Sequence, residues 1–216
     1  YAKQPDKFRM GGLPGFPFAI MRYMRKMEIF LEDILLEPER VMQLNEMVTR
    51  ELEGCIDNYA ALGTDGIFTC EDWGIQDRLL INPQVWREMF KPTLKRIFDR
   101  IHSKNMYVIM HSCGYIWDIL PDLIEIGVDA MQLDQPTLMG IEQVAELFDK
   151  KVTLFSPVDI QKILPTGDRE YIERSARQMV DLFASKGGGL IAKDYGDYKT
   201  LQIKDEWAGW MRDEFM

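Results

Sequence analysis

The sequence predicts an α/β fold, specifically a (β/α)8 TIM barrel that lacks its N-terminal strands in this chain. Short apolar segments alternate with helical patterns, and each apolar segment becomes polar at its C-terminal end. Nearly continuous apolar sequences are typical of parallel strands buried on both faces, and alternation with helices implies right-handed crossovers. An open doubly wound sheet usually carries a glycine-rich phosphate loop after its first strand, and the sequence has none there. These observations favour the barrel, whose site residues gather at the C-terminal ends of its strands.

Five apolar segments are the predicted strands, and a weaker sixth segment precedes them. They cover residues 66–70, 106–113, 129–134, 152–157 and 188–194, with 8–15 as the sixth. A full barrel takes about 250 residues, whereas this chain has 216 residues and begins at Tyr1 rather than at Met. We therefore expect residues 1–216 to form a single barrel domain that is the C-terminal two-thirds of a longer protein.

The segments between the predicted strands have the three-to-four-residue apolar spacing of amphipathic helices. Pro38 and Pro83 stand where helix starts are expected, and Asp168 can cap another helix. The first predicted helix begins near residue 19, and the others cover residues 38–62, 83–104, 116–126, 140–149, 168–186 and 204–215.

The composition is that of a globular protein, with 46% hydrophobic and 28% charged residues. A net charge of −9 argues against a nucleic-acid binder, which needs clustered Lys and Arg. No apolar run reaches the ~20 residues of a membrane span, and no signal peptide is recognisable. The three cysteines are too scattered for a disulfide framework. We therefore predict a cytoplasmic protein that acts on a small-molecule substrate and binds neither nucleic acid nor membrane.

The most informative stretch is YVIMHSCGYI, in which an apolar strand ends in a histidine and a cysteine. Residues two positions apart in a strand point to the same face, so the His111 imidazole and the Cys113 thiol converge. Both groups are zinc ligands, but catalytic zinc needs about three protein ligands. Candidates for the third, from neighbouring strand ends, are Cys70, Glu71 and Asp134. The alternative is a core histidine beside a small buried cysteine.

Other polar residues at strand ends are candidate catalytic and substrate-binding groups. Glu71 and Asp72 follow the first main strand, and at most one of them faces the pocket if the strand continues, because neighbouring side chains alternate. The inward carboxylate and His111 are the candidate catalytic groups: the carboxylate can serve as a general acid or base, or it can bind a cationic or protonated substrate. The alternative is a loop carboxylate that caps a helix or pairs with Arg78. Later strand ends supply the predicted substrate-binding residues Gln132, Asp134, Lys193 and Tyr195.

A family resemblance rests on four stretches, TDGIFTCEDWG, LLINPQVWREMFKPTLKRI, YVIMHSCGYI and LPDLIEIGVDAMQ. They resemble the uroporphyrinogen decarboxylase superfamily, and more closely its branch of cobalamin/corrinoid-dependent methyltransferases. The likeness extends from about Gly12 to the C-terminus. It implies a (β/α)8 barrel, zinc held by an H-x-C pair and a later cysteine, a thiol acceptor such as coenzyme M, a corrinoid as methyl carrier, and a corrinoid protein as partner.

His111 and Cys113 match the H-x-C pair, but the stretch near the last strand, GGGLIAKDYG, holds no cysteine. This departure implies that another side chain closes the zinc site, or that zinc is weakly bound or absent. The leading hypothesis is a corrinoid-dependent methyltransferase-like enzyme with zinc-assisted methyl transfer. Two alternatives stay open. One is a metal-free uroporphyrinogen decarboxylase of tetrapyrrole (porphyrin) biosynthesis, in which Asp72 stabilises pyrrole nitrogens; the other is a non-catalytic corrinoid- or tetrapyrrole-binding protein.

Overall fold

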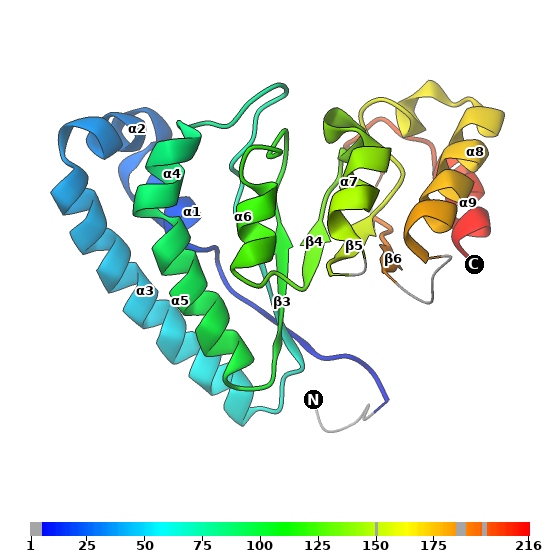
Figure 1. Ribbon diagram of the computed structural model, residues 1–216. Helices are drawn as coiled ribbons and strands as arrows, with labels where there is room; N and C mark the ends of the chain where they lie inside the picture. Colours follow the sequence, from blue (N-terminus) through cyan, green and yellow to red (C-terminus); the bar gives the residue numbers. More distant parts are fainter. Residues whose placement is uncertain (1–5, 150, 185–188, 196–197) are drawn as a thin grey trace.

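The computed structural model describes residues 6–149, 151–184, 189–195 and 198–216. Within them lies one six-stranded sheet in which every strand pairs in parallel with the next. The strands follow one another across the sheet in chain order (Figure 1). They are β1 (Met10–Gly12), β2 (Gly66–Cys70), β3 (Tyr107–His111), β4 (Ala130–Gln132), β5 (Thr153–Ser156) and β6 (Leu190–Ala192).

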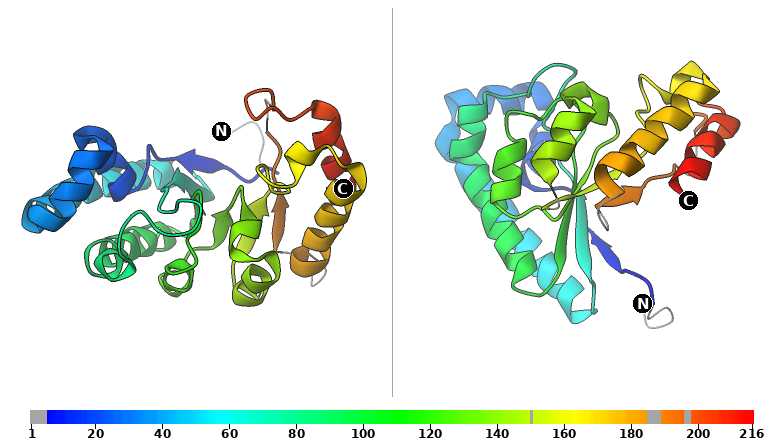
Figure 2. Two further views of the ribbon diagram at one scale, coloured as in Figure 1. Left: turned by 90° about the horizontal axis from the view of Figure 1, so that it is seen from above. Right: turned by 45° about the vertical axis from the view of Figure 1, so that its right-hand side comes forward.

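The order of the strands is that of a β/α barrel. A doubly wound sheet reverses its order at a switch point, whereas this sheet runs from β1 to β6 without reversal. The sheet is not closed, because β1 and β6 form its two edges. Seen from above, it is curved with helices along its outer side (Figure 2). The described residues therefore form an open part of a barrel, as the sequence predicts.

Helices connect consecutive strands and cover the outer side of the sheet (Figures 1 and 2). Within the described residues, no helix has both the length and the apolar composition needed to cross a membrane. The helices are α1 (Pro17–Arg25), α2 (Met27–Leu36), α3 (Pro38–Ala61), α4 (Pro83–Met89), α5 (Lys91–His102), α6 (Leu120–Glu125), α7 (Ile141–Phe148), α8 (Arg169–Met179) and α9 (Asp205–Phe215). Short 3₁₀ turns lie at Pro136–Met139 and Leu164–Thr166.

One predicted helix, 83–104, is two helices in the structure. α4 ends at Met89 and α5 begins at Lys91. Pro92 lies in the first turn of α5, where its missing N–H costs nothing, but it cannot extend the hydrogen-bond ladder of α4. The proline therefore explains why the chain restarts its helix at this point.

The end of the predicted helix 168–186 also differs. α8 passes into a π-helical turn at Val180–Ala184, and residues 185–186 lie outside the described residues. The predicted strand 188–194 is shorter, and its first residue also lies outside them. The other predicted elements differ from the observed ones by at most four residues at either end.

The two faces of the sheet have different surroundings. On the side of the helices, one row of side chains runs in register across β2 to β5. Each of its members is at most 1% exposed: Thr69, Met110, Met131 and Leu154. The concave side carries an apolar groove of about 530 Å³, lined among others by Ile109, Ala130 and Thr153. Such inward residues fill the interior of a closed barrel. Here Phe8 and Tyr107 at the groove are 54% and 55% exposed.

Glu71 anchors α1 at the carboxyl end of β2. Phe16, which precedes the helix, provides no side-chain cap, and Pro17 has no N–H to donate. The Glu71 carboxyl oxygens accept the N–H groups of Phe16, Phe18 and Ala19 at 2.9–3.1 Å. The Glu71 side chain is fully buried, and burial raises its pKa to about 8 against the pull of these donors. Glu71 is therefore a helix cap that fixes α1 beside the strand ends.

Glu71→Ala is expected to lower the free energy of unfolding by about 2–4 kcal/mol, because buried N–H groups lose their acceptor. Urea denaturation followed by circular dichroism measures this loss. The matched control is Glu28→Ala, at an exposed position of α2, which should change stability by less than about 0.5 kcal/mol. Equal losses in the two variants would contradict the capping role.

Candidate metal centre

Three potential metal ligands meet at the carboxyl ends of β2 and β3. The His111 Nε2 atom lies 3.1 Å from the Cys113 Sγ atom and 3.3 Å from the Asp72 Oδ1 atom. The ligand atoms of the three residues all lie within 4.8 Å of one another. His111 is 8% exposed, and Asp72 and Cys113 are partly buried. We call these residues the donor triad. The predicted convergence of His111 and Cys113 is confirmed.

The register of β2 against β3 places the triad. Cys70 pairs with His111, and the next residue, Glu71, donates its N–H to the His111 carbonyl at 2.9 Å. Side chains alternate along this extended segment, so Glu71 turns outward to α1 and Asp72 turns toward His111. The Cys113 N–H then donates to Asp72 Oδ1 at 3.0 Å. Only one of the two adjacent carboxylates therefore reaches the site.

Two glycines allow the loops after β2 and β3 to pack backbone against backbone. A Cβ atom on Gly114 would lie 2.5–2.6 Å from backbone atoms of Gly74 and Ile75, and one on Gly74 would lie 2.6–2.8 Å from those of Tyr115 and Cys113. Gly114 also has φ +77°, which disfavours other residues. The Tyr115 N–H donates to the Ile75 carbonyl at 2.7 Å. The glycines of the EDWG and HSCG stretches are thus needed for this contact.

The triad carries a buried ion pair. The hydrogen bond with His111 lowers the pKa of Asp72 well below its usual range, against the effect of burial. Burial disfavours the imidazolium form of His111, but the contacts with Asp72 and Cys113 outweigh burial and raise the pKa of His111 to about 10. The His111 Nδ1 atom is buried and has no hydrogen-bond partner among the described residues. The contacts with Asp72 and Cys113 therefore favour the protonated imidazole, paired with the carboxylate.

The donor set fits zinc. Zinc binds imidazole nitrogen, thiolate sulfur and carboxylate oxygen, and catalytic zinc uses three protein ligands with one position open. Tetrahedral zinc places such donor atoms about 3.3–3.6 Å from one another. The two distances from His111 Nε2, 3.1 and 3.3 Å, are close to this range, and all three donor atoms lie within 4.8 Å of one another. The residues present therefore suit a zinc ion, which would replace the proton on His111.

The four predicted substrate-binding residues form a second cluster. The Asp134 carboxylate accepts hydrogen bonds from Gln132 Nε2 at 2.7 Å and Lys193 Nζ at 2.8 Å. Lys193 Nζ also lies 3.1 Å from the Tyr195 hydroxyl and 4.2 Å from the centre of its ring. Burial, with a hydrogen bond to Asp134, raises the pKa of Tyr195 above its usual range. This cluster joins the ends of β4 and β6.

The second cluster adjoins the triad. Gln132 is the register partner of His111 on β4, and the charge of Asp134 contributes to the raised pKa of His111. None of the three predicted candidates for the third ligand, Cys70, Glu71 and Asp134, belongs to the triad among the described residues. Cys70, the register partner of His111, is exposed as a residue. Partial burial of its thiol raises the pKa of the thiol, and the charge of His111 acts to lower it. The third donor is Asp72 instead.

Arg22 contacts the site although no sequence pattern indicates it. From α1, its Nη2 atom lies 3.4 Å from Asp72 Oδ2 and its Nη1 atom 3.4 Å from the Asp72 carbonyl oxygen. Arg22 is fifty residues before Asp72 and stands in a helix that also carries Arg25. The contacts of α1 with Glu71 and Trp73 bring them together.

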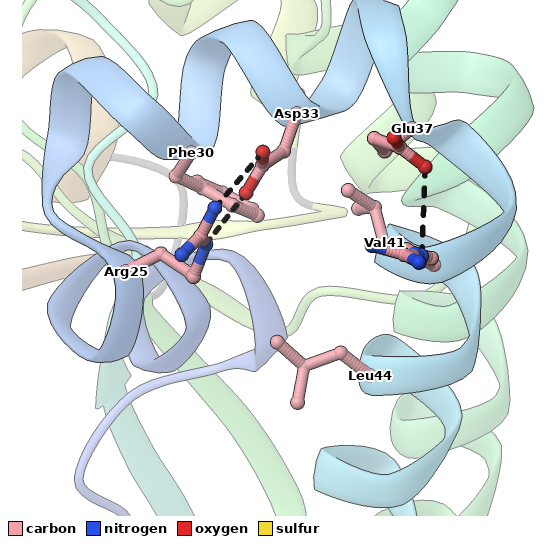
Figure 3. Close-up of a pocket in the computed structure, with 7 residues that line it drawn as sticks. Arg25, Phe30, Asp33, Glu37, Val41 and Leu44 are labelled. Atoms are coloured by element: carbon pink, nitrogen blue, oxygen red, sulfur yellow. Dashed lines mark hydrogen bonds and ion pairs between the residues drawn. The ribbon is translucent and has the colours of Figure 1, made fainter.

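A separate pocket lies among α1, α2 and α3 (Figure 3). It has a volume of about 250 Å³ and contains two arginines, each of which already faces a carboxylate. Arg25 pairs with Asp33 at 2.7 Å and Arg40 with Glu37 at 3.5 Å. Its remaining lining residues are apolar, namely Phe30, Val41 and Leu44. The pocket therefore offers no imidazole or thiol, and the strand ends remain the better candidate site.

The parallel strands, the helices outside them and the cluster at the strand ends define a β/α-barrel protein with an enzyme-like site. The family model described as Uroporphyrinogen decarboxylase (URO-D) matches residues 2–193. The chain therefore belongs to the uroporphyrinogen decarboxylase family. No curated protein matches it.

One of the similar solved structures supports the fold. A methyltransferase from Methanosarcina mazei matches with a TM-score of 0.76 and 19% identity, over 99% of this chain and 60% of that chain. An uncharacterized B. cereus protein matches with a TM-score of 0.44 and 18% identity, over 77% of this chain and 40% of that chain. A conserved Enterococcus faecalis protein of unknown function matches with a TM-score of 0.43 and 21% identity, over 77% of this chain and 43% of that chain. The chain thus spans 60% of the length of the methyltransferase, whose similarity shows the fold.

Zinc affinity should rise with pH, because the ion must displace a proton from His111, whose pKa is about 10. Below that pH the imidazolium competes with the metal, so this group alone should strengthen binding by about tenfold per pH unit. Competition with a chromophoric chelator between about pH 6.5 and 8.5 measures the slope.

Asp72→Asn is the comparison for this slope, since it removes a carboxylate that raises the pKa of His111. With the imidazole nearer its ordinary pKa of about 6.5, the slope in this variant should flatten above about pH 7. The same slope in both proteins would show that the ion pair does not control metal binding.

Proposed function

We propose that this protein is a corrinoid-dependent methyltransferase-like enzyme that uses zinc to transfer a methyl group to a thiol. The observation that carries the proposal is the donor triad at the carboxyl ends of β2 and β3, where a barrel of this class has its site. Membership of the family and the fold of the Methanosarcina mazei methyltransferase are consistent with it. A corrinoid, brought by a corrinoid protein, would supply the methyl group.

The residues have distinct roles in this proposal. Asp72, His111 and Cys113 would hold the zinc ion, which supplies a positive charge that lowers the pKa of an acceptor thiol. The acceptor thiol would release its proton to solvent, and its thiolate sulfur would take the methyl group as a cation from the corrinoid, with the cobalt–carbon bond breaking and its electron pair staying on cobalt. Asp72 takes the place of the later cysteine that the sequence lacks, because it provides a third donor from the neighbouring strand end.

The second cluster would bind the rest of the acceptor. Lys193 and Tyr195 present an ammonium and a hydroxyl group next to the triad. Asp134 accepts a hydrogen bond from the ammonium and is itself held by Gln132. Lys193 has 18% of its side chain exposed, so it is accessible to a polar group of the substrate. This arrangement orients a thiol whose other end is polar.

His111→Ala should abolish zinc binding and slow methyl transfer from methylcobalamin to coenzyme M by on the order of 100-fold or more. The absorbance of the cobalamin measures the rate, and elemental analysis measures the zinc. Cys55→Ser, at an exposed cysteine of α3, is the matched control and should keep both zinc and rate. A zinc-free wild-type protein, or full methyl transfer in His111→Ala, would rule the proposal out.

A second candidate function, metal-free decarboxylation of uroporphyrinogen, is favoured by the description of the family that the chain matches. In this reading Asp72 contacts the pyrrole nitrogens and cationic side chains hold the substrate carboxylates. Release of carbon dioxide from uroporphyrinogen that persists with chelator and in His111→Ala would favour the decarboxylase over the methyltransferase.

A further inference from the structure

Arg22 is largely buried beside Asp72. Its side chain is 11% exposed, and its guanidinium carbon lies 5.8 Å from the ring centre of Phe18 and 5.2 Å from that of Tyr23. Two guanidinium nitrogens face Asp72, one at the carboxylate and one at the backbone carbonyl, each at 3.4 Å. The guanidinium of Arg22 therefore has two aromatic rings and two oxygen atoms of Asp72 as neighbours, and these neighbours restrict its position.

The two carboxylate oxygens of Asp72 have different partners. Oδ1 accepts the Cys113 N–H and lies 3.3 Å from His111 Nε2. Oδ2 faces Arg22. Arg22 therefore pairs with Oδ2, the oxygen that contacts neither His111 nor Cys113. Oδ1 stays directed at His111 and Cys113. Metal-binding carboxylates commonly have such an outer partner, whose loss costs about 10–100-fold in metal affinity.

α1 is also fixed relative to the triad. Glu71, the neighbour of Asp72, accepts three N–H groups at the N-terminus of this helix. Phe18 of the same helix stacks on Trp73, with ring centres 3.9 Å apart. The segment of Glu71, Asp72 and Trp73 thus contacts α1 at each residue. Any displacement of α1 would move Arg22 relative to Asp72.

We propose that Arg22 is a positioning residue of the metal centre, which holds Asp72 so that Oδ1 stays with the His111 and Cys113 donors. This inference rests on the proposed function only in taking the triad to bind a metal ion. It gives α1 a part in metal affinity, although none of its residues belongs to the triad.

Titration with Co²⁺ and Zn²⁺ tests this role, with the absorption bands of Co²⁺ reporting on its ligands. Arg22→Gln should weaken binding by about 10–100-fold, and Arg22→Lys, which keeps the charge but not the planar fork, by less. Arg25→Gln is the matched control and should bind as the wild type does, because Arg25 lies on the same helix but pairs with Asp33 of α2 (Figure 3). Thermal unfolding shows that each variant is folded.

A double variant separates positioning from a general loss of structure. If Arg22 acts through Asp72, Arg22→Gln combined with Asp72→Asn should bind Co²⁺ as Asp72→Asn alone does, with the same bands. Additive losses, or wild-type affinity in Arg22→Gln, would overturn this inference and leave the proposed function standing. A wild-type protein that binds neither metal would overturn the proposed function and this inference with it.

Discussion

The pairing of β2 with β3 is the contact on which the candidate centre depends. Cys70 stands opposite His111, and the hydrogen bond from the Glu71 N–H to the His111 carbonyl extends this ladder by one residue. Alternation of side chains then directs Asp72 to His111 and Cys113. A slip of one residue would exchange the two carboxylates, because every side chain changes face. The same pairing therefore supplies both the third donor and the cap of α1.

The strand ends hold their charges in pairs, which is how buried charges are tolerated. Asp72 pairs with His111, and Asp134 pairs with Lys193. In the first pair both members are potential metal donors, and in the second the ammonium can engage a polar group. The two pairs are adjacent, since the charge of Asp134 acts on His111. This is the physical basis for proposing metal binding at one side of the site and acceptor binding at the other.

The sequence predicts the parallel strands well, since each apolar segment ends in polar residues, and the contact of His111 with Cys113 follows from strand alternation. The third donor is harder to predict. Whether Glu71 or Asp72 faces inward depends on whether pairing continues past Cys70, which is decided by β3 and not by local sequence. The four residues of the second cluster are predicted singly, but their mutual hydrogen bonds depend on the spacing of β4 and β6. The contact of Arg22 with Asp72 could not be predicted from the sequence, because Arg22 lies in a helix that is distant from Asp72 along the chain.

The close approach of Gly74 to Gly114 joins the loop after β2 to the loop after β3 through the backbone alone. A side chain at either position would force the two loops apart, and Asp72 would then move relative to His111 and Cys113. The ends of β4 and β6 are joined instead by side chains, through the hydrogen bonds of Gln132, Asp134 and Lys193. A substitution among these three residues would therefore change the second cluster and leave the backbone contact beside the triad in place.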